Sequence, residues 1–326
     1  MAVSRELEIA PSARPKPADY PFDLDAALSS IVSIRTVIPE DAFTAEVLGT
    51  ERSGNGVIIR KDGVILTIGY LVTEAEKVWI GLSDGRTVEG HVLGFDQETG
   101  FGLVQALARL NLPELPIGSS AKADLGTRVI TAGAGGRTRA LASRIVARQE
   151  FAGYWEYVLD QALFVAPSHP YWGGTGLIGP TGELLGIGSL QLEHGREGAG
   201  PAEQLNMFVP IDLLHPVIDD IMKFGRPNRP ARPWLGVYAT EIQNRVVIVG
   251  LSGRGPADLA DLRQGDVVLR VAGTRVEKLA TFFRAIWALG TAGVRVPLTI
   301  ERDGGRLEVE VKSGDRSAFL KRPRLH

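Results

Sequence analysis

Short apolar runs separated by Gly, Asp and Pro make up most of the chain from about residue 28 onward. The runs at 57–59 and 64–67 are rich in Val and Ile, and a Lys-Asp-Gly turn at 61–63 joins them. A second pair of runs meets at Ser-Asp-Gly, residues 83–85, and Asp-Gly is a strong hairpin signal. Many short strands at such spacing are typical of antiparallel barrels or sandwiches, so the pattern predicts a mainly β protein.

Helical spacing of apolar residues stands out in two places. In PIDLLHPVIDDIMKFG (210–225) these residues recur at intervals of three and four, and Gly225 fits a C-terminal stop. Pro216 lies near the start of this segment and is expected to bend or delay the helix. The second segment, EKLATFFRAIWALG (277–290), is predicted to be an amphipathic helix. Between the two, RPNRPARP (226–233) has the composition of a stiff, solvated linker.

The chain of 326 residues is longer than one compact domain usually needs, so two domains are expected. Residues 1–24 are rich in Pro, Ala and charge and are expected to form a mobile arm. The first folded domain is expected at 25–225 and the second at 234–316. The linker at 226–233 separates them, and a short tail follows at 317–326.

Composition narrows the classes of function. The formal net charge is −2 and the pI is about 6.3, which gives no basic surplus for a nucleic-acid partner. Cysteine is absent, which excludes disulfides, thiolate metal sites and a cysteine nucleophile, and no cofactor is expected. No apolar run suits a secretory signal or a membrane span. We therefore expect no membrane partner and a cytoplasmic location, or a periplasmic one if a leader has been removed.

Motifs along the chain resemble a known family. GNGVIIRKDGVILT, LSDGRTVEGHVLGFDQETG, GELLGIGSL and NMFVPIDLL occur in this order, and together they resemble the trypsin-like protease domain of the HtrA (Deg) family. RPWLGV, followed by GPADLADLRQGDVVLRVAGTRV, resembles the PDZ domain that this family carries at its C-terminal end. The resemblance covers roughly residues 28–316 and implies two six-stranded antiparallel β-barrels followed by a PDZ domain.

The resemblance also indicates where a Ser-His-Asp triad would stand. The histidine position, three residues after the LT motif, is Tyr70, and a phenol with a pKa of ~10 is a poor base at neutral pH. The aspartate position after FDQET is Gly100. The serine position, nine residues before Gly182, is Gly173, and a shift of one residue would place Trp172 there. All three catalytic positions are therefore vacant, and we predict a pseudoprotease.

Neighbouring residues do not rebuild a triad. Ser168 and His169 are adjacent, so on an extended segment their side chains would point to opposite faces. Thr175 follows the nucleophile position by two residues, but the other barrel is expected to supply no histidine near Tyr70. Pro170 lacks an N–H group, and an oxyanion hole is made of such backbone amides. A rewired serine-type endopeptidase remains the alternative prediction.

The second domain shows no comparable loss. A PDZ domain binds an extended peptide at a sheet edge and holds its C-terminal carboxylate with backbone amides of a short loop. The loop is predicted at WLGV, which comprises Trp234, Leu235, Gly236 and Val237. The other wall of the groove is predicted to be the helix at 277–290, with Leu279, Phe283 and Ile286 on one face and Phe282 in the core. A helical apolar stripe can equally be domain core, and Trp234 can equally pack against the linker.

Three functions follow from these observations. The first is a non-catalytic binding protein, in which the PDZ domain holds peptide or protein C-termini as a scaffold or chaperone-like module. The second is the rewired endopeptidase, and the third is a structural protein whose PDZ groove is closed. The resemblance further implies a homotrimer formed through aromatic residues before the first barrel strand, where Tyr20 and Phe22 stand. Two aromatics in a disordered arm are the alternative interpretation.

Overall fold

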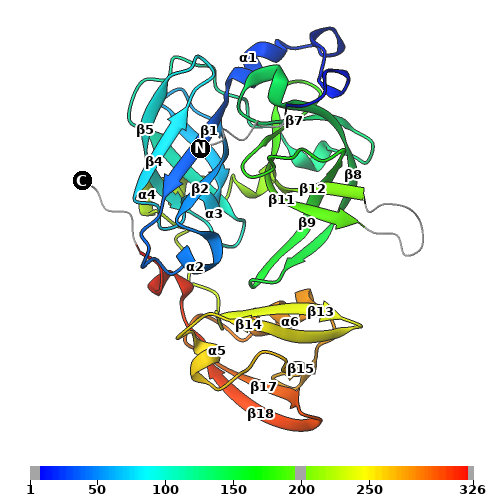
Figure 1. The fold of residues 1–326 in the computed structure, drawn as a ribbon. Helices are drawn as coiled ribbons and strands as arrows, with labels where there is room; N and C mark the ends of the chain where they lie inside the picture. Colours follow the sequence, from blue (N-terminus) through cyan, green and yellow to red (C-terminus); the bar gives the residue numbers. More distant parts are fainter. Residues whose placement is uncertain (1–7, 195–202, 322–326) are drawn as a thin grey trace, which may run out of the picture. The chain divides into compact units, whose positions relative to one another are not determined.

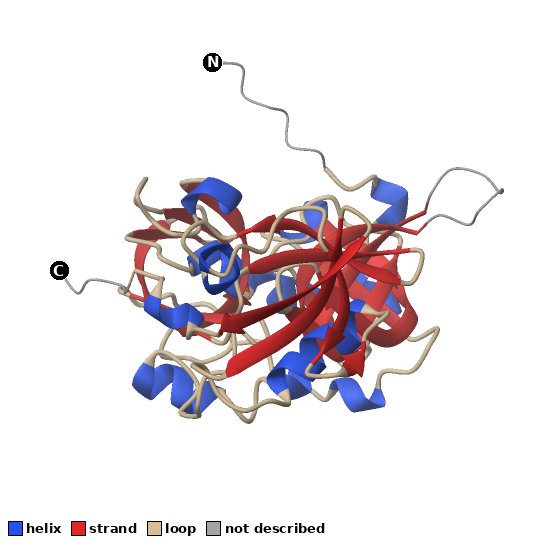
Figure 2. Ribbon diagram, turned by 90° about the horizontal axis from the view of Figure 1, so that it is seen from below, coloured by secondary structure: helices blue, strands red, loops and turns tan. Residues whose placement is uncertain are grey.

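The computed structural model describes residues 8–194 and 203–321, and these form two compact units. The first unit comprises residues 8–149, 161–227 and 321, and the second comprises residues 150–160 and 228–320. Strands predominate over short helices in both (Figure 2). Among the described residues, no helix has the length and apolar character needed to cross a bilayer.

The first unit begins with a closed barrel of six antiparallel strands in the order β1-β2-β3-β6-β5-β4 (Figure 1). Their bounds are β1 Ile31–Val37, β2 Glu51–Ile58, β3 Val64–Ile68, β4 Lys77–Gly81, β5 Thr87–Phe95 and β6 Phe101–Ala106. Every residue of β3 is buried, which explains its unbroken Val-Ile-Leu-Thr-Ile sequence. Helix α3 (Gly69–Val72) follows β3 at once and carries Tyr70.

A second closed barrel has the strand order β10-β11-β12-β9-β8-β7. Its strands are β7 Arg128–Ala132, β8 Ala140–Gly153, β9 Tyr157–Ala166, β10 Gly176–Ile178, β11 Leu184–His194 and β12 Glu203–Pro210. Val129, Leu163 and Phe208 contribute to its buried core. The ends of β8 and β9 and the turn that joins them, residues 150–160, belong to the second unit.

The second unit is built on a sheet in the order β13-β14-β15-β17-β18, with β16 paired to β15 (Figure 1). The strands are β13 Val237–Ile242, β14 Arg245–Leu251, β15 Val267–Val271, β16 Thr274–Arg275, β17 Arg295–Arg302 and β18 Gly305–Lys312. Helices α5 (Pro256–Leu259) and α6 (Leu279–Trp287) cover its core, in which Phe282, Phe283 and Ile286 are fully buried. Strand β13 is an edge of this sheet, and the other edge is β18.

The remaining helices are α1 Leu24–Ser29, α2 Ala45–Leu48 and α4 Ile218–Phe224. The helix expected at 210–225 is split, because a 3₁₀ turn at Ile211–Leu213 precedes α4. Pro216 lies between the two pieces, so the expected delay is confirmed. Gly225 ends α4 with φ of 75°, a left-handed conformation that glycine adopts at little cost.

The structure differs from the mobile arm expected at 1–24. Residues 1–7 lie outside the described residues, but two 3₁₀ turns form at Pro11–Ala13 and Pro17–Asp19. Ile9 is buried, and its N–H donates to the carbonyl oxygen of Thr138 over 3.0 Å. Buried apolar residues, among them Ile9 and Pro15, and a main-chain hydrogen bond thus hold a segment whose composition alone indicated disorder.

Candidate functional site

The two barrels bring the predicted histidine and serine positions together. Tyr70 comes from α3 in the first barrel, and Gly173 lies in the segment between β9 and β10 of the second. A Cβ atom placed on Gly173 would lie 2.7 Å from the phenol oxygen of Tyr70. A nucleophile and its base need such proximity, so the fold places the two predicted positions within reach of each other.

Tyr70 has the wrong chemistry for a base. Its hydroxyl donates a hydrogen bond of 3.0 Å to the carbonyl oxygen of Ser189. Burial raises the pKa of the phenol above its ordinary value, since the charged phenolate would lose its hydration. The group therefore stays protonated at neutral pH, and its proton is already donated to the main chain.

Gly100, at the aspartate position, is held by its backbone. Its φ is 86°, in the left-handed region, where a residue with a Cβ atom costs roughly 1–2 kcal/mol. Its N–H donates to the carbonyl oxygen of Asp96, and its own carbonyl oxygen accepts from Gly69 over 2.6 Å. The position thus forms a turn that suits glycine, and an aspartate placed here would be strained.

His169 is a structural residue in this fold. The side chain is buried, and Nδ1 accepts a hydrogen bond from the N–H of Tyr171 over 3.1 Å. Nε2 donates to the carbonyl oxygen of Arg139 over 3.0 Å, which fixes one neutral tautomer. Burial lowers the pKa of the imidazole. Both ring nitrogens are therefore engaged with the main chain, and neither is available to activate a nucleophile.

Backbone amides around Gly173 are also engaged. Tyr171 donates to His169, Gly174 donates to the carbonyl oxygen of Gly188 over 2.8 Å, and Thr175 donates to that of Trp172 over 3.2 Å. An oxyanion hole needs donors aimed at the substrate rather than at the protein. These three amides therefore stabilise the loop and cannot receive an oxyanion without breaking it.

Asn55 of β2 fastens this loop to the first barrel. Its Nδ2 donates to the carbonyl oxygens of Tyr171 and Gly173, and its Oδ1 accepts from the N–H of Ala134. Contact is so close that a Cβ atom on Gly174 would lie 1.9 Å from the carbonyl oxygen of Asn55. Tyr70 and Asn55 thus occupy the surroundings of the serine position, and the loop is pinned there.

The rewiring candidates do not meet a base. Ser168 Oγ accepts a hydrogen bond from the side chain of Gln191 over 3.3 Å. Thr175 is buried, and its hydroxyl donates to the carbonyl oxygen of Trp172 over 2.9 Å. A nucleophile requires a general base within hydrogen-bonding reach, and the partners of these two hydroxyls are an amide and a carbonyl.

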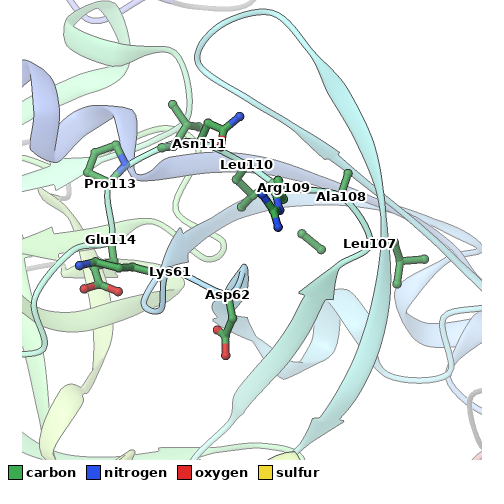
Figure 3. Close-up of a pocket in the computed structure, with 11 residues that line it drawn as sticks. Lys61, Asp62, Leu107, Ala108, Arg109, Leu110, Asn111, Pro113 and Glu114 are labelled. Atoms are coloured by element: carbon green, nitrogen blue, oxygen red, sulfur yellow. The ribbon is translucent and has the colours of Figure 1, made fainter.

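An open pocket of about 600 Å³ lies elsewhere on the first unit, lined by Lys61, Asp62 and residues 106–114 (Figure 3). Its lining includes none of the three predicted triad positions. Charges of both signs line it, and the carboxylate of Asp62 is already paired with Arg60 over 2.7 Å. Nothing in this lining indicates a reaction.

The predicted carboxylate loop does hold a carboxylate, and that group belongs to Glu156. The N–H groups of Leu235, Gly236 and Val237 donate to its Oε1 over 3.2, 2.7 and 3.1 Å. Leu235 also donates to Oε2 over 3.1 Å. Gly236 has φ of 78°, which turns the amides toward one point, as expected for a loop that captures an anion.

Sequence analysis did not select Glu156. The residue lies in the turn between β8 and β9, in the sequence Tyr154-Trp155-Glu156, which contains none of the Gly, Asn or Asp residues common in hairpin turns. The absence of these turn residues is the signal that could have identified Glu156. Burial raises the pKa of the Glu156 carboxyl to about 7, although the three amides act in the opposite direction.

The other predicted PDZ residues are buried in the second unit. Trp234 pairs with Gly314 through two main-chain hydrogen bonds, and its ring lies 4.9 Å from that of Phe319, so these partners lie outside the linker at 226–233. Leu279, Phe283 and Ile286 are buried in the same cluster as Phe282. Their role as the wall of a peptide groove stays a prediction.

Comparisons with known proteins agree with this architecture. A family model described as a trypsin-like peptidase domain matches residues 54–187, and one described as a PDZ domain matches residues 233–313. The serine endoprotease DegS of Haemophilus influenzae is 29% identical over 67% of this chain and 64% of its own length. A probable periplasmic DegP-like serine endoprotease of Halomonas elongata is 28% identical over 80% of this chain. The chain spans only 56% of that relative.

Solved structures show the same fold. The serine endoprotease of Yersinia pestis has a TM-score of 0.52 at 21% identity, covering 90% of this chain and 98% of that one. The HtrA-type protease AlgW with a decapeptide has a TM-score of 0.53 at 19% identity, covering 92% of this chain and 99% of that one. The mainly β fold, with a trypsin-like double barrel followed by a PDZ domain, is confirmed.

The contact between positions 70 and 173 predicts non-additive stability effects. Gly173→Ala should destabilise the protein by about 1–3 kcal/mol, because the new Cβ displaces the phenol and its hydrogen bond to Ser189. In a Tyr70→Phe background the oxygen is gone, so the same change should cost at least about 1 kcal/mol less. Urea unfolding of the four proteins measures this coupling, and simple additivity would contradict the geometry.

The Glu156 carboxyl predicts a pH dependence with a definite sign. Its pKa is about 7 when buried and 4.5 when exposed, so the folded state binds more protons between these values. The protonated group's stabilisation is complete below pH 4.5 and is lost as the pH rises through 7.

Relative to Glu156→Gln, which does not titrate, the natural chain should therefore lose stability from pH 5 to pH 8. Thermal unfolding of both proteins across this range measures the difference. A difference that is constant with pH, or that grows in favour of the natural chain, would contradict the assignment.

Proposed function

Because the chain is a homologue of the HtrA (Deg) proteins, with a trypsin-like peptidase domain followed by a PDZ domain, we propose that it is a catalytically inactive pseudoprotease which binds peptides or proteins through the PDZ domain. The observation that carries the proposal is the contact between the protonated Tyr70 phenol and Gly173, where a triad needs a base and a nucleophile.

The size of the expected loss of turnover separates the inactive protein from the active alternative. Removing a serine-protease triad lowers turnover on the order of 10⁶-fold, and what remains comes from substrate binding and the oxyanion hole. In this chain the amides of Tyr171, Gly174 and Thr175 are bonded to other groups of the protein, so that residual contribution is also reduced. The rewired endopeptidase is the weaker candidate, because the hydroxyls of Ser168 and Thr175 are bonded to an amide and a carbonyl rather than to a base.

Binding through the PDZ domain is supported by the three amides at 235–237, which already converge on a carboxylate. A peptide C-terminus presents the same group, and the edge strand β13 lies next to the loop for strand addition. A scaffold or chaperone-like role would use this groove. A purely structural role remains the second candidate, and it is favoured by the groove being filled in this conformation.

Cleavage of an unfolded, fluorescently labelled protein tests the inactive assignment. The natural chain should release no label above background, because it lacks both base and nucleophile. The variant Tyr70→His/Gly100→Asp/Gly173→Ser should gain measurable turnover, limited by strain at position 100. The same variant with Gly173→Ala instead of Ser is the matched control. Cleavage by the natural chain that a serine-directed inhibitor blocks would overturn the proposal.

A homotrimer formed through Tyr20 and Phe22 is part of the proposal. The two rings lie 5.4 Å apart and are only partly buried, although Phe22 also packs beside Gly182. Light scattering of the purified chain should give three times 35.1 kDa, and Tyr20→Ala/Phe22→Ala should lower that mass. A monomeric mass for the natural chain would exclude the trimer.

The compartment also belongs to the proposal. The sequence led us to expect the cytoplasm, with the periplasm as the alternative. The DegP-like relative from Halomonas elongata is described as periplasmic, which supports the second location.

A further inference from the structure

The last residue of the turn that joins β8 and β9 adopts a backbone conformation that its residue type does not favour. Glu156 has φ of 60°, in the left-handed region. Gly or Asn would adopt this conformation at lower cost, and hairpin turns of this length usually carry one of them at such a position. Hairpin formation alone therefore does not explain a glutamate here, and the explanation must lie in what its carboxylate contacts.

The carboxylate is the group that the loop is shaped to hold. Glu156 is only 7% exposed, and the amides of residues 235–237 surround its Oε1. Burying a carboxylate is costly unless donors replace its hydration. Among ligands for a PDZ loop, a peptide C-terminus would meet the same three donors, so the side chain stands in for a terminal carboxylate.

The main chain of the hairpin also follows the binding mode of a peptide. The N–H of Ala239, on the edge strand β13, donates to the carbonyl oxygen of Tyr154 over 2.9 Å. The donor lies two residues beyond Val237, and the acceptor lies two residues before Glu156. Carboxylate capture and a main-chain hydrogen bond at the sheet edge therefore occur together, which are the two kinds of contact that β-augmentation uses.

Contacts on both sides keep the hairpin in place. Ala152 and Val158 pack against the buried cluster that contains the apolar face of α6. Arg284 of α6 forms exposed ion pairs with Glu150 and with Asp160, the second over 2.5 Å. Glu150 lies on β8 and Asp160 on β9, so each strand of the hairpin contributes one partner. Exposed ion pairs of this kind contribute little individually, so they orient the hairpin more than they lock it.

We infer that residues 150–160 are an internal ligand of the PDZ domain, with Glu156 occupying the carboxylate loop, and that external peptides with a free C-terminal carboxylate bind by displacing this hairpin. The inference rests on the proposed function and adds its regulation. Binding sites available only in a minor open state have their apparent affinity reduced by the open fraction. Removing Glu156 should raise peptide affinity by that same factor.

The test uses the full chain and a fluorescein-labelled peptide, FAGYWV, which copies the hairpin with valine in place of Glu156 and ends in a free carboxylate. The same peptide with an amidated C-terminus is the control, because it lacks the negative charge. The test variant is Glu156→Gly, which removes the carboxylate and relieves the left-handed strain, so the turn still forms. Glu156→Gln keeps one acceptor oxygen without charge. Glu308→Gln, on β18 at the opposite edge, is the matched charge control.

Fluorescence anisotropy should give a dissociation constant at least about tenfold lower for Glu156→Gly than for the natural chain. Glu156→Gln should fall between them, Glu308→Gln should match the natural chain, and the amidated peptide should bind none of them well. Equal affinity for the natural chain and Glu156→Gly, or weaker binding by the variant, would overturn the inference.

Amide hydrogen exchange at residues 235–237 separates this inference from the proposed function. Exchange should accelerate in Glu156→Gly, because the three N–H groups lose their acceptor, and should be unchanged in Glu308→Gln. Faster exchange in Glu156→Gly, without peptide binding by any variant, would support the internal ligand and contradict the peptide-binding function. Unchanged exchange would overturn the internal ligand, whatever the peptide does.

Discussion

A buried carboxylate is tolerated only where hydrogen-bond donors replace water, and this constraint organises the second unit. Glu156 meets three donors from one short loop, and Gly236 makes their convergence sterically possible. For the group to reach them, β8 and β9 must extend to Gly153 and Tyr157 and turn there. The main-chain hydrogen bond from Ala239 to Tyr154 and the ion pairs of Arg284 follow from that placement.

The same demand for paired polar groups governs the surroundings of the predicted triad positions. A catalytic cleft keeps a base, a nucleophile and amides unpaired for the substrate. Here the phenol of Tyr70 donates to Ser189, His169 is bonded at both ring nitrogens, and Asn55 holds the carbonyl oxygen of Gly173. Each of these groups is bonded within the protein rather than left open to a substrate, which supports the proposed pseudoprotease.

Local signals accounted for much of the fold. Turn residues and apolar periodicity predicted the hairpins, the delay at Pro216 and the stop at Gly225, because each depends on neighbours a few residues away. Composition was a poorer guide for residues 8–23, where the burial of Ile9 outweighs a Pro-rich sequence. Motif spacing located the two positions that face each other, Tyr70 and Gly173, although neither carries a catalytic group.

The sequence by itself determined the mainly β double barrel with a PDZ domain, since short motifs carry it, and the same motifs predict the triad positions and the carboxylate loop at 234–237. Only the tertiary structure decided what fills these sites. Glu156 meets Leu235 across 79 positions of sequence, and Asn55 meets Gly173 across 118. Such pairings depend on how closed barrels and an edge strand bring distant segments together. The periodicity of apolar residues along the chain does not predict which polar groups become hydrogen-bond partners.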